Sequence, residues 1–329
     1  MTTPLVSIGL PVYNGARCIR QALDSLLAQT YTHLELVICD NASTDDTGAI
    51  CQAYAARDAR VRYYRNPINV GLFNNFRLAV QRSTGEYFMW AAVDDRKPPT
   101  AVADCVRAVQ NQPSAVMAHG IVLVQSPGRA ELVPCANAMD LSMSDTAARL
   151  RAFTAGMVHN AMLYASLYRL AALRQVYLGD GLGHDYMLCL QMCLLGPIAY
   201  TGTPTVIYAE RAPRPNDNPM YTMLPMTLGR LLSSGRMRRR KCWTVLLRGG
   251  YELARLSHVP WPTRRRGIWA HATAFWQRYH GRLLREMVFQ SCAPLAWLSL
   301  RAWRLAQSWT LTAALARKAH ARLTPRHDL

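Results

Sequence analysis

Two adjacent carboxylates, Asp94 and Asp95, follow the apolar and aromatic run YFMWAAV. A run of this length without helical spacing is typical of a strand buried on both faces. The two aspartates are therefore expected to point out from a sheet edge beyond that strand. Hard divalent cations prefer carboxylate oxygens, so the pair is a candidate cation site. Aspartate is also common in ordinary turns, which is the alternative interpretation.

Polar residues follow three earlier apolar runs in the same way. They are Tyr13 and Asn14, with Pro11 before them, after LVSIGL, Asp40 and Asn41 after LELVIC, and Asn66 and Asn69 after VRYY. Ligands of open α/β sheets bind beyond the carboxyl ends of the strands, so these strand ends are expected to converge on one rim. The phosphate-binding signatures GxGxxG and GxxxxGK[ST] are absent from the sequence, which favours a carboxylate-bound cation as the partner of a phosphate. Asp40 and Asn41 could also cap the helix that follows them.

The elements that position these residues alternate along the first 125 residues. Short apolar runs and helical patterns take turns, which is typical of βαβ units and a parallel sheet. Helices are predicted near residues 16–29, from residue 43, near residues 72–82, and after Pro99. Ser43 and Asp46 have the spacing of a capping box at the second of these helices. The predicted fold class is α/β, with a mixed, mainly parallel sheet flanked by helices.

A further carboxylate, Asp185, lies at the predicted start of a helix in GHDYMLCLQMCLLGPI. The helix dipole favours an acidic residue there whatever its function. A carboxylate at this place could also accept the proton of a reacting hydroxyl. Asp180, five residues earlier, is the competing candidate, and the neighbouring His184 is interpreted as a loop histidine.

The charge of the chain is concentrated in its last third. The 329 residues carry a formal net charge of +18, yet residues 1–210 have 16 basic and 16 acidic residues. Residues 211–329 also hold seven of the eight tryptophans and are predicted to be helical from 219 to 320. Their longest nearly uncharged stretch, MVFQSCAPLAWLSL, is about fourteen residues, shorter than the roughly 20 that a spanning helix needs. Arg and Trp on helices instead favour a membrane surface, and RMRRRK at 236–241 favours an anionic partner over a solvated charge block.

The cysteines and the N-terminus indicate an intracellular setting. Nine cysteines are scattered without a CxxC pair, so a disulfide framework or a zinc site is not expected. The sequence MTTPLVSIGL lacks the basic region of a signal peptide. We therefore expect a cytoplasmic protein.

Two long segments, VSIGLPVYNGARCIRQALDSLLAQTYTHLELVICDNASTDDT and NPINVGLFNNFRLAVQRSTGEYFMWAAVDD, resemble the family 2 glycosyltransferases. These are inverting enzymes with the GT-A fold, a Rossmann-like fold for nucleotide-diphospho-sugars. With a looser match in GHDYMLCLQMCLLGPI, the resemblance covers roughly residues 4–210. It implies a catalytic domain over residues 1–215 and leaves residues 216–329 as a basic, Trp-rich helical region for membrane-surface contact or interaction.

The resemblance also implies a role for each polar strand end. Pro11, Tyr13 and Asn14 match the loop that packs against the nucleotide base, and Asp40 matches the carboxylate that accepts a hydrogen bond from the uracil ring. By the same resemblance, Asp94 is expected near the ribose, Asp95 is expected to bind the Mg²⁺ or Mn²⁺ that bridges the diphosphate, and Asp185 matches the general base. Asn69 joins the nucleotide-sugar-binding set, with a simple chain turn at Asn69 and Gly71 as an equal alternative.

This sequence departs from the family pattern at one position. Many relatives read D-A-D-D where this chain has Ala92 in the first place, which leaves Asp95 as the one firm metal ligand. Family members often present an Arg or His to the diphosphate from a later loop, for which Arg211 and Arg214 are candidates.

These observations together predict an inverting glycosyltransferase of the bacterial surface-polysaccharide or lipopolysaccharide type. It would move a sugar from a UDP-hexose or UDP-N-acetylhexosamine to a hydroxyl of a glycan or lipid-linked acceptor, assisted by a divalent cation. It would work at the inner face of the cell membrane. The alternative is a nucleic-acid- or membrane-binding protein that uses the basic tail and has a catalytically silent sugar-nucleotide-binding domain. A neutral first two-thirds with an acidic rim argues against nucleic acid.

Overall fold

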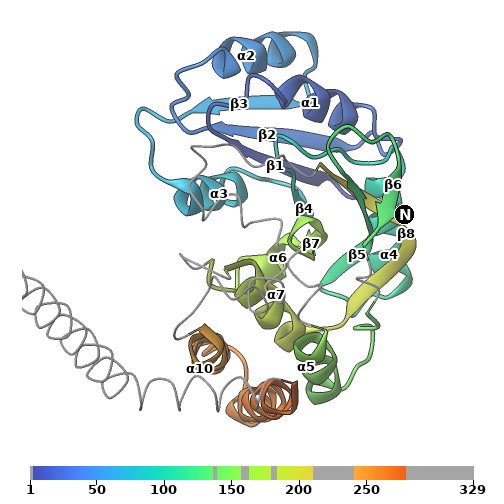
Figure 1. Ribbon diagram of the computed structural model, residues 1–329, viewed down its shortest axis with the longest axis vertical. Coiled ribbons are helices and arrows are strands. Elements are labelled where there is room, and N and C mark those ends of the chain that lie inside the picture. The colour runs from blue at the N-terminus through green and yellow to red at the C-terminus, as the bar shows by residue number, and fades with distance from the viewer. Residues whose placement is uncertain (1–2, 136–138, 157–162, 179–183, 210–240, 279–329) are drawn as a thin grey trace, which may run out of the picture. The chain divides into compact units, whose positions relative to one another are not determined.

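The computed structural model of the protein describes residues 3–135, 139–156, 163–178, 184–209 and 241–278. An eight-stranded sheet runs in the order β3-β2-β1-β4-β7-β5-β6, with β8 paired to β5 (Figure 1). The strands are β1 (Val6–Val12), β2 (Leu34–Asp40), β3 (Val61–Arg65), β4 (Tyr87–Trp90), β5 (Met117–Gln125), β6 (Leu132–Pro134), β7 (Leu167–Arg169) and β8 (Ile198–Ala209). The helices are α1 (Ile19–Leu27), α2 (Thr47–Arg57), α3 (Leu72–Gln81), α4 (Ala101–Asn111), α5 (Thr146–Ala155), α6 (Leu170–Leu173), α7 (His184–Leu195), α10 (Lys241–Ala254) and a helix over 261–278.

The first half of the sheet is parallel. Strands β3, β2, β1 and β4 pair in parallel, and all residues of β1, β2 and β4 are buried. In the register of β1 and β2, Val12 pairs with Asp40, so the two strands end side by side. The predicted α/β class with helices flanking a mainly parallel sheet is confirmed.

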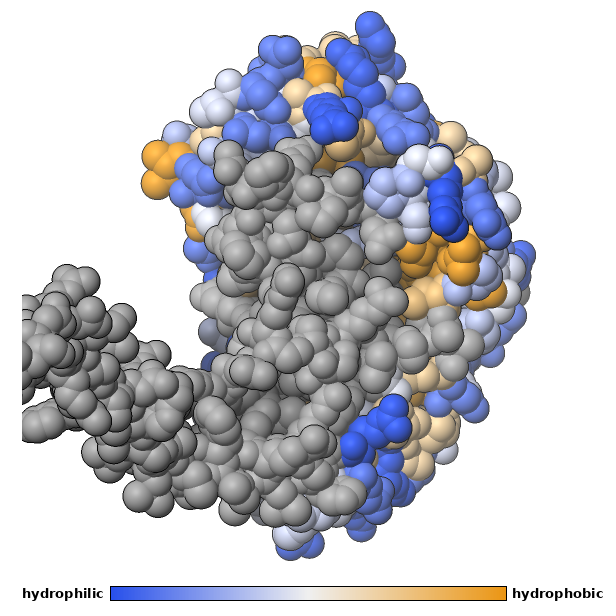
Figure 2. Space-filling view, viewed as in Figure 1, coloured by the Kyte–Doolittle hydropathy of each residue, from blue (hydrophilic) through white to orange (hydrophobic). Residues whose placement is uncertain are grey.

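The second half of the sheet is mixed. Strand β7 is antiparallel to β4 and to β5, β6 is antiparallel to β5, and β8 is parallel to β5. The segment AVMAHGIVLV, expected as one strand or a pair, forms the single strand β5. The loop between β3 and α3 and strand β6 expose the apolar side chains of Ile68 and Val133, and Figure 2 shows apolar surface at both places.

Two local expectations are wrong. The capping box at Ser43 does not form, because α2 begins only at Thr47 and its N-cap, Asp46, makes no side-chain cap. The hydroxyl of Ser43 instead accepts a hydrogen bond from the backbone N–H of Asn14, at 2.9 Å. The strand in YFMWAAV ends at Trp90, so Asp94 and Asp95 lie in a turn beyond it.

The described helices of the last third pack against α5 and α7. The Nδ1 atom of His271 lies 3.1 Å from the hydroxyl of Thr154 in α5. A Cβ added to Gly267 would lie 2.8 Å from a methyl group of Leu194 in α7, so the two helices approach closely there. The first compact unit of the chain extends from Met1 to Arg278, past the domain boundary predicted at residue 215.

Some sequence predictions fall on undescribed residues. Outside the described residues lie the basic run at 236–240, the candidates Arg211 and Arg214, the competing base Asp180 and everything beyond residue 278. Among the helices that are described, none combines the length and the apolar character needed to cross a membrane.

Candidate active site

The carboxyl ends of β1 and β2 are joined by the loop that follows β2. The backbone N–H of Ser43 donates to Oδ1 of Asp40 at 2.8 Å, and that of Thr44 donates to Oδ1 of Asn14 at 2.8 Å. Asn14 has a φ of 51°, a left-handed conformation that asparagine tolerates better than most residues. The predicted residues Asn14 and Asp40 therefore belong to one hydrogen-bonded loop cluster.

Two other predicted residues flank this cluster. Pro11 lies inside β1, where it is buried and pairs in register with Cys39 of β2. Tyr13 follows the strand and is 50% exposed. An exposed aromatic ring above a buried strand end is available to pack against a flat ligand.

Asp40 is fully buried and already holds several donors. Its Oδ2 accepts hydrogen bonds from the hydroxyl of Tyr63 and from Nη1 of Arg65, both at 2.7 Å. Burial, and after it the hydrogen bond to Asp40, raises the pKa of Tyr63 to about 12, so Tyr63 stays a donor. A carboxylate has about four acceptor positions, so any base contact by Asp40 would use its remaining capacity. That contact stays a prediction.

Arg65 is a site residue that the sequence interpretation missed. Besides Asp40, its guanidinium binds the carbonyl of Ser43 at 2.7 Å and lines a recess of about 540 Å³ together with Tyr63 and Gln52. Arg65 ends the third parallel strand, one residue before Asn66. Its position at the end of a predicted strand, like those of the other predicted residues, could have identified it from the sequence.

A network of asparagines holds the loop that contains Asn69. Nδ2 of Asn41 donates to Oδ1 of Asn69 at 2.7 Å, and Nδ2 of Asn66 donates to Oδ1 of Asn41 and of Asn75, both at 3.1 Å. Oδ1 of Asn69 also accepts from the N–H of Gly71, whose φ is 84°. Asn69 therefore shapes a turn at the rim, and its predicted ligand contact is compatible with that turn.

We expect Asn75→Leu to lower the free energy of unfolding by about 1–3 kcal/mol, because it strips hydrogen bonds from buried groups. Asn75 is buried, and its Nδ2 donates to the carbonyl of Cys39 at 2.8 Å. Urea denaturation measures the change. The exposed neighbour is the matched control, since Asn74→Leu should change stability by at most about 0.5 kcal/mol. Equal effects of both substitutions would contradict a structural role of the network.

The loop that carries Asp94 and Asp95 is fixed to strand β8. Backbone hydrogen bonds of 3.0 and 2.8 Å connect Arg96 and Ile207 in both directions. Oδ1 of Asp95 accepts a hydrogen bond from the N–H of Ala209 at 3.2 Å. Both aspartates are half-buried. The pair therefore lies on a backbone held by two strands, β4 before it and β8 beside it.

Lys97 ties the same loop to the segment that contains Ala165. Its side chain is buried, and Nζ donates to the carbonyl of Ala165 at 3.1 Å. Burial lowers the pKa of Lys97 from 10.5 to about 8, and the nearby Asp95 carboxylate partly opposes this shift.

This lowered pKa predicts a pH dependence of stability. Between pH 8 and 10.5 the unfolded chain keeps the Lys97 proton that the folded protein has lost, so stability rises with pH across this window. The expected gain is about 3 kcal/mol. Urea denaturation of wild type and Lys97→Met over this range measures it as the difference between the two proteins. Parallel stability curves would contradict it.

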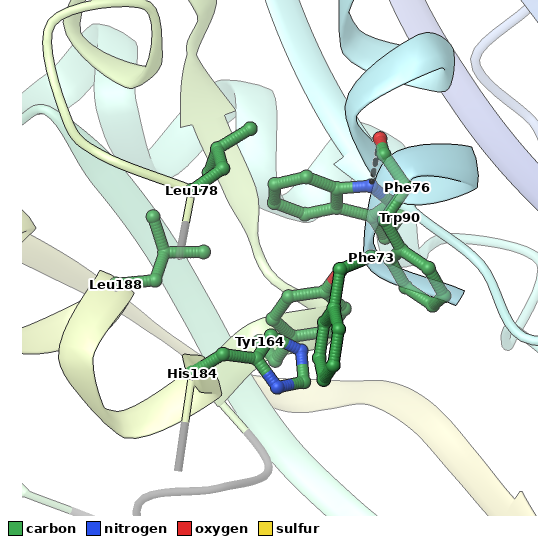
Figure 3. A pocket seen from close by; sticks show the side chains of 7 residues that line it. All are labelled: Phe73, Phe76, Trp90, Tyr164, Leu178, His184 and Leu188. Carbon is green, nitrogen blue, oxygen red and sulfur yellow. Dashed lines mark hydrogen bonds between the residues drawn. The ribbon is translucent and has the colours of Figure 1, made fainter. Parts of the chain in front are cut away.

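An aromatic cluster joins the start of α7 to the end of β4 (Figure 3). Tyr164 stacks on Trp90 with ring centroids 4.6 Å apart, and the ring of His184 lies 5.6 Å from Tyr164 and 4.7 Å from Phe73. With Phe76, Leu178 and Leu188 these side chains line a small cavity of about 20 Å³. The cluster connects α3, which follows the Asn69 loop, with β4 and α7.

Asp185 lies at the first turn of α7, beside this cluster. It is half-buried, and its Oδ1 accepts a hydrogen bond from the N–H of Tyr186 at 2.8 Å. Burial, and after it the Asp185 charge, raises the pKa of Tyr164 well above its usual value. The ring of His184, the residue before Asp185, lies 5.6 Å from that of Tyr164, so the first turn of α7 lies beside Tyr164. Trp90, which stacks on Tyr164, lies four residues before Asp94.

The donor set of the Asp94 and Asp95 turn fits a cation shared with a diphosphate. Mg²⁺ at such sites takes one or two carboxylates and completes its shell with phosphate oxygens and water. Within the described ranges, no three or more Cys, His, Asp or Glu side chains form a group that could hold a metal. The residues therefore suit a cation that arrives with its ligand better than a preformed protein cage.

Sequence comparison gives the class of the chain. Residues 7–171, half of the chain, match the sequence pattern of Glycosyl transferase family 2. The chain therefore belongs to this family, and the predicted enzyme class, glycosyltransferase, is confirmed.

Particular relatives share only a segment with this chain. An uncharacterized glycosyltransferase of Rickettsia bellii is 34% identical over 130 residues, which is 38% of this chain and 18% of that protein. The chondroitin synthase of Escherichia coli is 41% identical over 103 residues, or 31% of this chain and 15% of that protein. The matched segment thus spans less than a fifth of either relative.

The fold is similar to that of Staphylococcus aureus TarS, residues 1–349. That crystal structure superposes with a TM-score of 0.53 at 16% identity, over 84% of this chain and 91% of TarS 1–349. At this identity the likeness concerns the fold alone.

Proposed function

We propose that the protein transfers a sugar from a UDP-sugar to an acceptor hydroxyl with inversion at the anomeric carbon. The observation that carries the proposal is the aromatic cluster, which couples the helix start bearing Asp185 to the strand that leads to Asp94 and Asp95. A proton acceptor and a diphosphate-binding turn are the two parts that such a reaction needs close together.

Each carboxylate has a distinct part in the proposed reaction. Asp185 takes the proton of the attacking hydroxyl, a contribution of about 10²- to 10⁴-fold in rate. Asp95 would hold Mg²⁺ or Mn²⁺, which neutralises the charge that develops on the leaving diphosphate. Asp94 contacts the ribose. Attack opposite the leaving group then inverts the configuration, so an α-linked donor gives a β-glycoside.

The donor is proposed to be a UDP-hexose or a UDP-N-acetylhexosamine. TarS, whose fold is similar, has been crystallised with UDP and with UDP-GlcNAc, which supports a nucleotide-sugar donor here. Tyr13 would pack on the base, and the ordered Asn14, Asp40 and Asn69 loops would surround the nucleoside. Their hydrogen bonds fix these loops before a ligand arrives, which lowers the entropic cost of binding.

The acceptor is proposed to be a bacterial surface glycan carried on lipid, as in polysaccharide or lipopolysaccharide synthesis. The basic excess in residues 211–329 supports a partner that is an anionic membrane surface. The protein would then meet its acceptor at the inner face of the cell membrane.

A donor hydrolysis screen tests the proposed function. Purified full chain is incubated with UDP-, GDP- and dTDP-sugars, with and without Mn²⁺, and release of nucleoside diphosphate is measured. We expect release from one UDP-sugar that depends on the cation. Tight binding of a nucleotide sugar without turnover, even with added glycan acceptors, would instead indicate a catalytically silent binding domain.

A further inference from the structure

The helix over 261–278 has two different faces. Its buried residues are Gly267, Ala270, His271, Ala274 and Phe275. Its outer side carries large aromatic rings, with Trp261, Trp269 and Trp276 exposed to 52%, 67% and 45%. At roughly 100° per residue, the three tryptophans and Arg265 fall within an arc of about 80° on the side away from the buried residues. We call Trp261, Arg265, Arg266, Trp269 and Trp276 the Trp face.

The inner side of this helix is used for folding. His271 contacts Thr154 of α5, and its ring lies 6.3 Å from that of Tyr186 in α7. Gly267 lies against Leu194, near the other end of α7. Arg264 lies over the ring of Trp261 at 5.3 Å. The packing of the helix on α5 and α7 leaves Trp269 67% exposed. Exposed tryptophan is costly in water, which points to a role in binding.

The charge around the Trp face is one-sided. Six arginines and a single carboxylate, Glu252, occur between residues 246 and 278. Glu252 is buried and lies 3.7 Å from the guanidinium groups of both Arg248 and Arg255. Arg265 and Arg266 are exposed on the outer side. The outer surface therefore combines positive charge with aromatic rings and presents no carboxylate from this stretch.

We propose that the Trp face docks on an anionic phospholipid surface. Tryptophan settles at the headgroup level, where its ring is half in hydrocarbon and its N–H is hydrated, and arginine binds lipid phosphates. A second copy of this chain fits less well, since a two-fold contact would bring together two copies of the same positively charged face. Nucleic acid binds along grooves in which bases stack on successive rings, whereas these rings lie on the outer side of one helix.

Docking through this face has a consequence for the active site. The inner side of the same helix contacts α7, whose first turn bears Asp185. A docked protein would therefore hold the proposed base at a fixed orientation to the membrane. This consequence rests on the proposed function, but the docking itself does not.

Vesicle flotation of the full chain tests the proposal. Wild type should bind vesicles with phosphatidylglycerol more tightly than pure phosphatidylcholine vesicles, and added salt should weaken that binding. Trp269→Ala should lower the partition coefficient at least about fivefold in either salt condition. Arg265→Gln combined with Arg266→Gln should lower it roughly 30-fold, at low salt only. The control for Trp269→Ala is Tyr200→Ala, which removes an exposed ring elsewhere. The control for the arginine pair is Arg57→Gln combined with Arg129→Gln, which removes two exposed charges elsewhere. Neither control should change the partition coefficient.

Other results would overturn the proposal. Unchanged vesicle binding in both Trp-face variants would overturn it. So would binding of the wild type to DNA with the same affinity and salt dependence as its binding to anionic vesicles. A wild-type dimer that Trp269→Ala converts to monomer would assign the face to a second copy. Transfer to a soluble acceptor is measured in parallel and should be equal in wild type and Trp269→Ala. If neither wild type nor Trp269→Ala transfers sugar, while the Trp-face variants lose vesicle binding as expected, the proposed function fails and the docking surface stands.

Discussion

Asp185→Asn is expected to lower kcat by about 10²- to 10⁴-fold, because an amide cannot take up the proton of the attacking hydroxyl. The affinity for the nucleotide sugar should stay unchanged, since Asp185 lies at the start of α7, whereas the predicted nucleotide-binding residues follow strands of the parallel half of the sheet. Asparagine keeps an Oδ1 atom that can accept the N–H of Tyr186, as Asp185 does at 2.8 Å. The substitution therefore removes the proton acceptor while preserving the local fold.

Single-turnover rates and nucleotide titrations on wild type and Asp185→Asn separate the two effects. Asp180→Asn is the matched control, because Asp180 is the competing carboxylate, five residues before Asp185 in the sequence. We expect the control to retain wild-type kcat. Loss of kcat in Asp180→Asn alone would move the base assignment to that residue, and loss in neither would rule out a carboxylate base from this segment.

The sequence was sufficient to predict which polar residues lie at the carboxyl ends of the parallel strands. Buried parallel strands leave near-continuous apolar runs, and polar residues after such runs must lie at the carboxyl edge. Asn14, Asp40 and Asn69 therefore lie where their positions in the sequence predict. Their contact with a ligand stays a prediction.

The partners of these residues could not be predicted from local patterns. Arg65 meets Asp40 across 25 positions, and Tyr164 reaches Trp90 and His184 from a different part of the chain. Such contacts depend on how three elements pack, and neither periodicity nor capping rules encode that packing. The capping box at Ser43 failed for the same reason, since a competing contact with Asn14 from the preceding loop took its hydroxyl.

The packing of 261–278 on the first two-thirds of the chain was also hidden. Its composition indicates a basic helix, and only the small residues hint at a close contact. A Cβ at Gly249 would lie 2.3 Å from Nε2 of His271, and one at Gly267 would lie 2.9 Å from a methyl group of Leu150. Composition therefore indicates a basic helical region, but it does not encode the close contacts of this helix with Leu150 and Leu194.

Asp95→Asn is expected to lower kcat/KM by about 10²- to 10³-fold at saturating Mn²⁺, because several kcal/mol of leaving-group stabilisation depend on a cation that an amide holds poorly. The loop should keep its position, since asparagine retains the oxygen that accepts the N–H of Ala209 at 3.2 Å. The effect then reports the lost ligand charge and not a displaced strand.

Calorimetric titration of the UDP-sugar with and without Mn²⁺ gives a readout that does not depend on turnover. Wild type should bind the donor more tightly with Mn²⁺, and Asp95→Asn should bind it equally with and without the ion. Asp94→Asn is the adjacent control, which should weaken donor binding but keep the response to Mn²⁺, because Asp94 is assigned to the ribose. A response to Mn²⁺ that survives in Asp95→Asn and disappears in Asp94→Asn would exchange the two roles. A carboxylate ligand contributes to cation affinity mainly through its negative charge, which each substitution removes. A response to Mn²⁺ that survives in both variants would therefore place the cation away from this turn.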